Sequence, residues 1–328
     1  MSLFSSSVPE SAPPLISVIM PCYNAERFVA AAVDSVLTQT HPNVELIVID
    51  DGSTDGSLDI LRKYGQRLRL LTQANQGPYP ARNLGLRDAA GELVAFLDAD
   101  DWWSPDCLAK LYQGLVIHPE CALAYCGWQH VGAANRSNDP FVPRDYEVPE
   151  KLEQLLRGGS PWPIHAALVR RSAIEQIGGF REDLSTSLDY ELWLRLAAAN
   201  PVILVPEVLA FYRFHGEGQI SSRPYRQALN GWRIKRRFLQ DNAVMSQTMG
   251  RGKVRQIVNQ ALLKRGYDFF WRRDLVSAQK VFRHCLTRGV WYPRDLKYLL
   301  PSLLPGVWYR GLIRRSDQRG GRRVGGEP

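Results

Sequence analysis

Short apolar runs alternate with helix-forming stretches over the first 120 residues of the chain. Four of these runs indicate strands, at 15–21, 44–50, 68–72 and 92–98; those at 15–21, 44–50 and 92–98 are continuous apolar runs that indicate buried strands. The intervening stretches have apolar residues at helical spacing; they are 25–39, 57–65, 79–91 and 104–117, with Asn24 and Ser104 as expected N-caps. This alternation predicts an α/β fold with a mostly parallel central sheet and helices on both of its faces.

Two acidic clusters follow these runs, at the points where the second and fourth strands are expected to end. The first is "DDGSTD" (50–55) and the second is "DADD" (98–101). The carboxyl ends of parallel strands meet at one edge of a sheet, where such folds bind ligands. Carboxylates crowded there repel one another unless a cation lies among them, and Mg²⁺ or Mn²⁺ binds carboxylate together with phosphate oxygens. The clusters therefore predict a divalent cation that neutralises a diphosphate, although each also fits a solvated loop or an ordinary turn.

The sequence changes character beyond residue 120. Short strands and loops surround one clear helix at 189–200, and the chain from about 222 onward is helical and rich in arginine. We therefore expect a flexible N-terminus at 1–14, an α/β domain at 15–221, a basic helical region at 222–314 and a disordered tail at 315–328.

Three segments together resemble the nucleotide-binding half of family 2 glycosyltransferases, which have the GT-A fold. They are "SVIMPCYNAERFVAAAVDSVLTQTHPNVELIVIDDGSTDGS", "NQGPYPARNLGL" and "GELVAFLDADDWWSPDCL". The similarity is dense over residues 15–120 and looser to about 220. It implies an inverting glycosyltransferase whose GT-A domain has a nucleotide-binding half (15–120) and an acceptor half (121–221) and is followed by a C-terminal helical region. Processive members carry a Q-x-x-R-W motif, and "QALNGWR" has the wrong spacing for it, so we expect transfer of a single sugar.

The resemblance also implies a donor site. Pro21 and Tyr23 would line the pocket of the nucleotide base, with Tyr23 stacking on the base. Asp51 would accept a hydrogen bond from the base, typically uracil, and Arg82 would lie near the diphosphate. The other residues expected at the nucleotide sugar are Asn24, Asp50, Asp98 and Ala99.

The metal ligands follow from the same resemblance. Asp100 would be the principal ligand of Mg²⁺ or Mn²⁺, and Asp98 would contact either this ion or the ribose. Asp101 matches an extra acid that is frequent in the family, and its role stays open.

The expected catalytic base is Asp189, in "TSLDYELWLRL". A carboxylate there would take the proton of the acceptor hydroxyl as the new bond forms. Leu188 stands where the family usually has Glu, and Glu191 is a rival base two residues away. Asp189 could also serve as the N-cap of the helix that follows.

Four further residues are candidates for the acceptor wall or for a lid over the donor. Arg213 and His215 could reach the diphosphate or close over the donor, although His215 also fits a surface loop. Trp162 and His165 could contact the acceptor, because sugars stack on aromatic faces, although Trp162 fits the core equally well.

The charge of the chain is divided unevenly. Residues 1–221 hold 17 Lys and Arg against 27 Asp and Glu, a net of −10, whereas residues 222–328 hold 24 against 6, a net of +18. Arg mixed with Trp, Tyr and Leu on helices fits an element that lies on an anionic membrane surface. A solvated helical bundle is the alternative, and no nucleic-acid motif accompanies the charge.

These observations predict an enzyme that moves one sugar from a nucleotide-diphosphate sugar, with UDP the expected nucleotide, to a hydroxyl of a glycan or lipid-linked acceptor. The expected setting is cell-surface polysaccharide biosynthesis in the cytoplasm, at the inner face of the membrane. A nucleotidyltransferase is one alternative, although "PCYNAER" stands where that class usually has a Gly-rich loop. A catalytically silent sugar-nucleotide or glycan-binding module is another.

Overall fold

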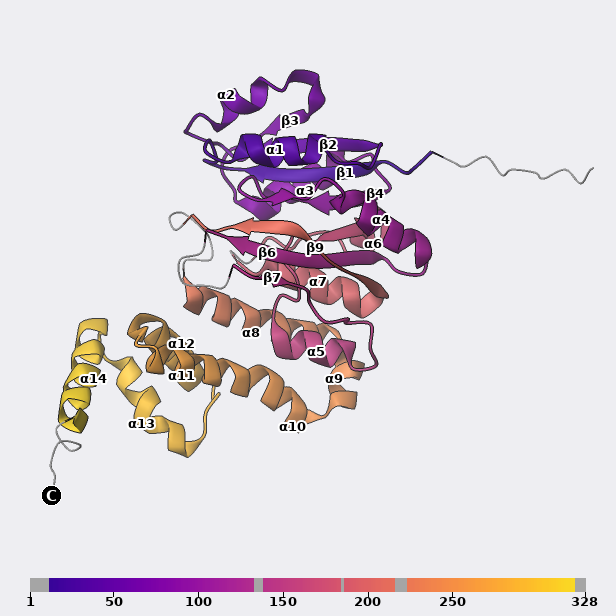
Figure 1. Ribbon diagram of the computed structural model, residues 1–328. Coiled ribbons are helices and arrows are strands. Elements are labelled where there is room, and N and C mark those ends of the chain that lie inside the picture. The colour runs from indigo at the N-terminus through magenta and orange to yellow at the C-terminus, as the bar shows by residue number, and fades with distance from the viewer. Residues whose placement is uncertain (1–11, 133–137, 184–185, 216–222, 322–328) are drawn as a thin grey trace, which may run out of the picture. The chain divides into compact units, whose positions relative to one another are not determined.

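The computed structural model describes residues 12–132, 138–183, 186–215 and 223–321 (Figure 1). Contacts within the chain divide it into two compact units. Unit 1 runs to His215 without residues 156–159, and unit 2 consists of 156–159 and the chain from 216 onward. The domain boundary expected at 221 falls in 216–222, outside the described residues, and so does most of the N-terminus expected to be flexible.

Unit 1 is built around one sheet with the strand order β3-β2-β1-β4-β8-β6-β9-β5, and β7 pairs with β6. The strands are β1 (Ile16–Cys22), β2 (Val44–Asp50), β3 (Arg69–Thr72), β4 (Leu93–Phe96), β5 (Trp102–Trp103), β6 (Leu123–Val131), β7 (Pro140–Phe141), β8 (Ala167–Arg170) and β9 (Val202–Arg213). The four strands expected from the apolar runs are β1 to β4.

The first four strands are parallel, because β1 pairs with both β2 and β4, and β2 pairs with β3. Every residue of β1 is buried, which explains its continuous apolar run. The chain steps from β1 out to β3 and then returns past both strands to β4. Right-handed crossovers therefore put the helix after β3 on the opposite face from the helices before it. The order reverses between β1 and β4, and ligands bind at such a switch point.

The other half of the sheet is mixed. β8 is antiparallel to β4 and β6, β9 is parallel to β6, and β5 is antiparallel to β9. Trp102 of β5 pairs with Phe211 of β9. This pairing fixes the turn that contains "DADD" between β4 and β5 and brings it against the end of β9.

Helices connect these strands; they are α1 (Val29–Leu37), α2 (Ser57–Arg62), α3 (Pro78–Asp88), α4 (Cys107–Ile117), α5 (Lys151–Gly158), α6 (Arg171–Gln176) and α7 (Leu188–Ala199), with a 3₁₀ turn at Gly65–Arg67. Both expected N-caps are wrong. Phe28 precedes α1 and Asp106 precedes α4, because a turn separates Asn24 and Ser104 from the helices that follow. Ser104 Oγ instead donates to Asp106 Oδ1 at 2.8 Å.

Unit 2 is helical; its elements are α8 (Pro224–Asp241), α9 (Ala243–Met249), α10 (Arg251–Val254), a π-helical turn (Arg255–Gln260), α11 (Ala261–Trp271), α12 (Leu275–Thr287), α13 (Leu296–Leu299) and α14 (Gly306–Gly321), with 3₁₀ turns at Pro293–Asp295 and Leu300–Leu303. α11 and α12 approach closely at Gly266, where a Cβ would lie 2.7 Å from Phe282 Cε1.

The tail expected to be disordered from 315 is partly helical, because α14 continues to Gly321. Arginine is a good helix former, so an Arg-rich segment can extend a helix that is already established. Residues 322–328 lie outside the described part of the chain. Among the helices that the structure describes, none has the length and apolar content needed to cross a bilayer.

Candidate functional site

The ends of β1 and β2 are tied together at the edge of the sheet. Tyr23, directly after β1, is 50% exposed, so its ring is open to solvent. Asn24 has a positive φ of 49° and accepts a hydrogen bond from the Thr54 amide at Oδ1, at 2.8 Å. The Asn24 amide donates to Ser53 Oγ at 3.1 Å. Asn24 therefore fixes the turn after β2, while Pro21 is buried within β1.

Asp50 and Asp51 are both buried, at 3% and 2% exposed. Asp51 accepts three hydrogen bonds: from Gln73 Nε2 (2.7 Å), the Gln76 amide (2.9 Å) and the Gly77 amide (2.8 Å). Both of its oxygens thus hold the loop that leads into α3. Asp50 Oδ2 accepts from the Ser53 amide at 3.3 Å, and its Oδ1 has no hydrogen-bond partner among the described residues.

Arg82 and Asp98 form an ion pair between α3 and the end of β4. Arg82 Nη2 donates to Asp98 Oδ1. The guanidinium lies over the rings of Tyr79 (5.4 Å) and Phe180 (5.7 Å), and the whole residue is 4% exposed. The Asp98 side chain is 31% exposed, whereas Ala99 beside it is buried. The pair therefore presents one carboxylate to solvent and holds its cation below the surface.

Asp100 faces Arg213 of β9 and His215, which follows that strand. Its Oδ2 lies 3.0 Å from His215 Nε2, and its carbonyl accepts from Arg213 Nε at 3.0 Å. The Arg213 guanidinium lies over the rings of Phe28 (5.1 Å) and Trp102 (4.5 Å). Burial, followed by the charges of Asp101 and Asp98, raises the pKa of Asp100 to about 6 despite His215. The ionised form of Asp100 is thus costly here, and added positive charge would stabilise it.

Asp101 points inward and fixes the turn. It is 1% exposed, its Oδ1 accepts from the Arg213 amide at 2.8 Å, and its Oδ2 lies 3.1 Å from Nδ1 of the fully buried His165. Burial raises the pKa of Asp101. Burial alone would lower the pKa of His165, but the Asp101 carboxylate outweighs it and the pKa is raised. His165 therefore serves the turn and offers no surface to an acceptor in this structure.

The exposed carboxylates fit a divalent cation that shares its coordination with a ligand. The side chains of Asp98 and Asp100 are 31% and 28% exposed; one oxygen of Asp98 faces Arg82, and one oxygen of Asp100 faces His215. Among the described residues, no three acidic, His or Cys side chains converge as a complete metal cage. Two carboxylates completed by phosphate oxygens are a common arrangement for Mg²⁺, so the donor set suits an ion that arrives with a diphosphate.

Asp189 lies in the first turn of α7, beside the ion pair of Arg82 and Asp98. Ser187, with φ of 66°, precedes the helix, so Asp189 is inside the first turn and is not its N-cap. Asp189 Oδ2 accepts from Ser160 Oγ at 3.2 Å. Burial raises the pKa of Asp189, and its carboxylate is close enough to interact electrostatically with Arg82 and Asp98. Leu188, at the position where the family usually has Glu, is fully buried.

Glu191 is engaged elsewhere, so the structure argues against its use as a base. Its side chain is 6% exposed and its two oxygens accept from Arg195 Nε (2.7 Å) and Nη2 (2.6 Å). Arg181 Nε lies 3.3 Å from Oε1 on the other side. The spacing of Glu191 and Arg195, four apart on a helix, is a sequence signal for such a pair.

Trp162 is 1% exposed, and its ring stacks on Tyr125 with the centroids 4.1 Å apart. Neither face of this indole is open to a sugar, because the ring is packed in the core. The core-packing alternative therefore describes Trp162 in this structure. Two residues near Asp189 were missed by the sequence argument. Tyr79 OH accepts from the Leu188 amide at 3.3 Å, and Ser160 donates to Asp189. Tyr79 lies in the "NQGPYPARNLGL" segment, whereas no sequence signal marks Ser160.

The fold and these residues define an α/β domain with an acidic site at the switch point of its sheet, and comparison with known proteins identifies the family. A family model described as glycosyl transferase family 2 matches residues 17–178. A putative teichuronic acid biosynthesis glycosyltransferase, TuaG of Bacillus subtilis (strain 168), is 33% identical over 230 residues, which is 68% of this chain and 88% of that protein. The chain belongs to glycosyl transferase family 2, and its activity is that of a glycosyltransferase.

Solved structures of similar fold agree with the expected GT-A architecture. S. aureus TarS 1-349 in complex with UDP-GlcNAc has a TM-score of 0.62 at 20% identity, over 93% of this chain and 92% of that one. Mannosyltransferase PcManGT from Pyrobaculum calidifontis, in complex with GDP-Man and Mn²⁺, has a TM-score of 0.58 at 19% identity, over 94% of this chain and 88% of that one. The predicted fold class, a GT-A domain followed by a helical C-terminal region, is confirmed.

Proposed function

We propose that the chain is an inverting glycosyltransferase that moves one sugar from a UDP-linked donor to a hydroxyl of a glycan or lipid-linked acceptor. The observation that carries this proposal is the grouping of Asp189, Arg82 and Asp98 at the switch point of the sheet. A half-buried carboxylate with a raised pKa lies within electrostatic reach of an Arg and a partly exposed Asp. A base and a diphosphate-binding group are the two elements that this reaction needs.

The proposed reaction is a single displacement. The acceptor hydroxyl attacks the anomeric carbon as Asp189 takes its proton, and the bond from that carbon to the diphosphate oxygen breaks with its electron pair on the leaving group. One displacement inverts the anomeric centre, so no second nucleophilic carboxylate is needed. Ser160 and the helix end hold the Asp189 carboxylate in place.

Asp98 and Asp100 are the proposed ligands of Mg²⁺ or Mn²⁺, and glycosyltransferases of the GT-A fold commonly use divalent cations. Such an ion would neutralise charge on the departing diphosphate. Arg82 contributes a second positive charge from below the surface. Tyr23 is the proposed stacking surface for the base, since its ring is exposed.

The donor pocket differs from the sequence expectation in one respect. Asp51 already accepts three hydrogen bonds from the loop at 73–77. We therefore assign Asp51 the role of holding this loop beside the base, and any contact with the base is made by a carboxylate that is already oriented.

Cell-surface polysaccharide biosynthesis is the proposed setting, because the similar TuaG is named for teichuronic acid biosynthesis. We also propose that unit 2 binds the inner face of the cytoplasmic membrane. Six large apolar side chains of its C-terminal part are between 46% and 71% exposed; they are Trp271, Leu300, Leu303, Val307, Trp308 and Leu312, here called the C-terminal apolar set. Exposed tryptophan and leucine beside arginine suit a membrane interface with anionic lipid.

A donor panel tests the transferase proposal. Purified full-length protein is incubated with UDP- and GDP-linked sugars, in Mn²⁺ and in EDTA, and release of the nucleotide diphosphate is measured. We expect slow metal-dependent release from one UDP-sugar, lost in Asp100→Ala. Equal release of the nucleotide diphosphate in EDTA and in Mn²⁺ would contradict the proposed metal dependence. Release from a GDP-sugar alone would contradict the proposed UDP-linked donor. Binding without release in any acceptor extract would favour the silent-module alternative.

A further inference from the structure

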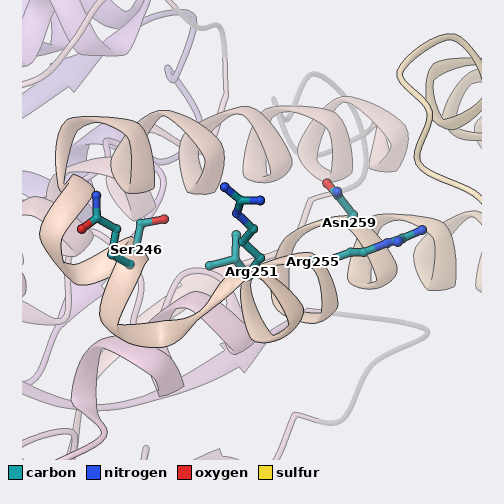
Figure 2. Close-up of a pocket in the computed structure, with 6 residues that line it drawn as sticks. Ser246, Arg251, Arg255 and Asn259 are labelled. Carbon is teal, nitrogen blue, oxygen red and sulfur yellow. The ribbon is translucent and has the colours of Figure 1, made fainter.

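Unit 2 has an open cavity of about 460 Å³ on its own surface (Figure 2). Five of its six lining residues carry polar or basic side chains, although apolar atoms form most of the surface that faces the cavity; the residues are Ser246, Gln247, Arg251, Val254, Arg255 and Asn259. None of these lining residues is acidic, which disfavours a metal ion. Hydroxyl, amide and guanidinium groups together suit an anion with several oxygens.

A π-helical turn aligns the basic side of this cavity. Residues 251–271 form one continuous helical stretch, interrupted in its hydrogen bonding by the π turn at 255–260. In an α-helix, residues eight apart differ by about 80° around the axis. The wider π turn brings Asn259 back above Arg251, and Figure 2 shows these two side chains rising from the same side of the helix. Turns of this kind are frequent at functional sites.

Within the described residues, no ion pair neutralises the two guanidinium groups of the lining. Arg251 and Arg255 lie four residues apart on one helix, a spacing at which like charges repel. Neither has an acidic partner among the described residues. Arg255 is held by the ring of Tyr292, 4.6 Å from its guanidinium carbon, and Gln260 Nε2 donates to Tyr292 OH at 2.6 Å. A guanidinium stacked in this way keeps its N–H groups free for a ligand.

We propose that this cavity binds a phosphate-bearing group, with Arg251 as its principal contact. Phosphate matches the planar fork of arginine and removes the repulsion between the two cations. The cavity is larger than a phosphate ion, so the group is expected to carry a sugar or glycerol that contacts Ser246 and Gln247. The surrounding region supports an anion, since residues 222–328 have a net charge of +18. This proposal does not depend on the glycosyl transfer reaction.

Calorimetric titration of the full-length protein with glucose 1-phosphate is the first test. We expect Arg251→Gln to weaken binding at this cavity about tenfold or more, as expected when a charge-assisted hydrogen bond is lost. Arg251→Lys keeps the positive charge but loses the planar guanidinium group. Its affinity for glucose 1-phosphate should therefore lie between those of the wild type and Arg251→Gln. Arg272→Gln is the matched control, because Arg272 is exposed just past the other end of the same helical stretch and lies outside the lining. Equal affinity in the Arg251→Gln and Arg272→Gln variants would overturn the proposal.

A vesicle experiment separates the two sources of such a phosphate. Sedimentation with phosphatidylcholine vesicles, with and without phosphatidylglycerol, is compared for the same variants. A selective loss for Arg251→Gln identifies a lipid headgroup, whereas weakened binding of glucose 1-phosphate alone identifies a soluble phosphate. If neither measurement distinguishes Arg251→Gln from Arg272→Gln, the cavity is not a phosphate site. Release of UDP from the donor panel is measured in parallel, and its failure would leave these binding results unaffected.

Discussion

Asp189 and Glu191 lie two residues apart in α7, yet their surroundings assign them different tasks. Asp189 has one hydrogen bond from a hydroxyl, whereas Glu191 is bound at both oxygens by Arg195. We expect Asp189→Asn to lower kcat by about 10² to 10⁴, the usual contribution of a general base. Donor affinity, measured by titration with UDP-sugar, should change little. A variant that retains most of its turnover would exclude Asp189 as the base.

The pH dependence of kcat/KM separates Asp189 from the other acids of the site. A base acts when deprotonated, so activity should rise with pH through the pKa of Asp189, which burial raises above the usual range of aspartate. The Ser160 hydroxyl lowers that pKa by its hydrogen bond. Ser160→Ala should therefore move the acid limb to higher pH, and Ser160→Thr, which keeps the hydroxyl, should not. If the acid limb of the kcat/KM profile stays at the same pH in Ser160→Ala, it reports the titration of a group other than Asp189.

Glu191→Gln should damage stability more than chemistry. Loss of this carboxylate leaves the Arg195 guanidinium, 14% exposed, without its charged partner. Breaking a buried pair in this way costs about 3–5 kcal/mol. Glu175→Gln is the matched control, since Glu175 pairs with Arg171 four residues away but is 63% exposed, and should cost about 1 kcal/mol or less. Urea denaturation measures both, and equal losses would contradict the assignment of Glu191 to the core of the fold.

At the scale of elements, the packing of α3 against the sheet positions Arg82 and Tyr79 at the site. Gly85 of α3 faces β1 and β2, where an added Cβ would lie 2.5 Å from Ile19 Cγ2 and 2.9 Å from Ile49 Cδ1. We expect Gly85→Ala to destabilise the protein by about 1–3 kcal/mol through overpacking. Gly231→Ala in α8 has open space around its Cβ and should stabilise by up to about 1 kcal/mol. Thermal denaturation of the two variants should thus shift in opposite directions.

The sequence was informative about elements wherever local chemistry sets them. β1, β2 and β4 were predictable because strands buried on both faces are continuously apolar, and the alternation of β1 to β4 with helices predicted the edge that holds the acids. The mixed half was not predictable in the same way, since the pairing of β5 with β9 joins residues far apart in the chain. The hydrogen-bond and ion-pair partners of Asp51 and Asp101 could not be predicted from the sequence for the same reason. Gln73 and His165 lie 22 and 64 positions away from them along the chain, and only the folded sheet brings them into contact.

At the scale of the whole molecule, the division of charge sets where the chain can bind. The N-terminal 221 residues carry a net charge of −10 and the remainder +18. An acidic surface is repelled by anionic lipid, whereas a basic one is attracted to it with a strength that falls as salt increases. Attraction alone is reversible, so the membrane proposal also requires apolar side chains that enter the interface.

The C-terminal apolar set supplies these side chains, and Trp308 tests them. It is 67% exposed in α14, one turn from Leu312. We expect the full-length protein to sediment with vesicles that contain phosphatidylglycerol, and the sedimented fraction to fall in high salt. Trp308→Ala should weaken vesicle binding severalfold, because an interfacial anchor is lost. Phe141→Ala is the control, since Phe141 is 50% exposed in unit 1. If charge alone were responsible, Trp308→Ala would bind like wild type and only the salt dependence would remain.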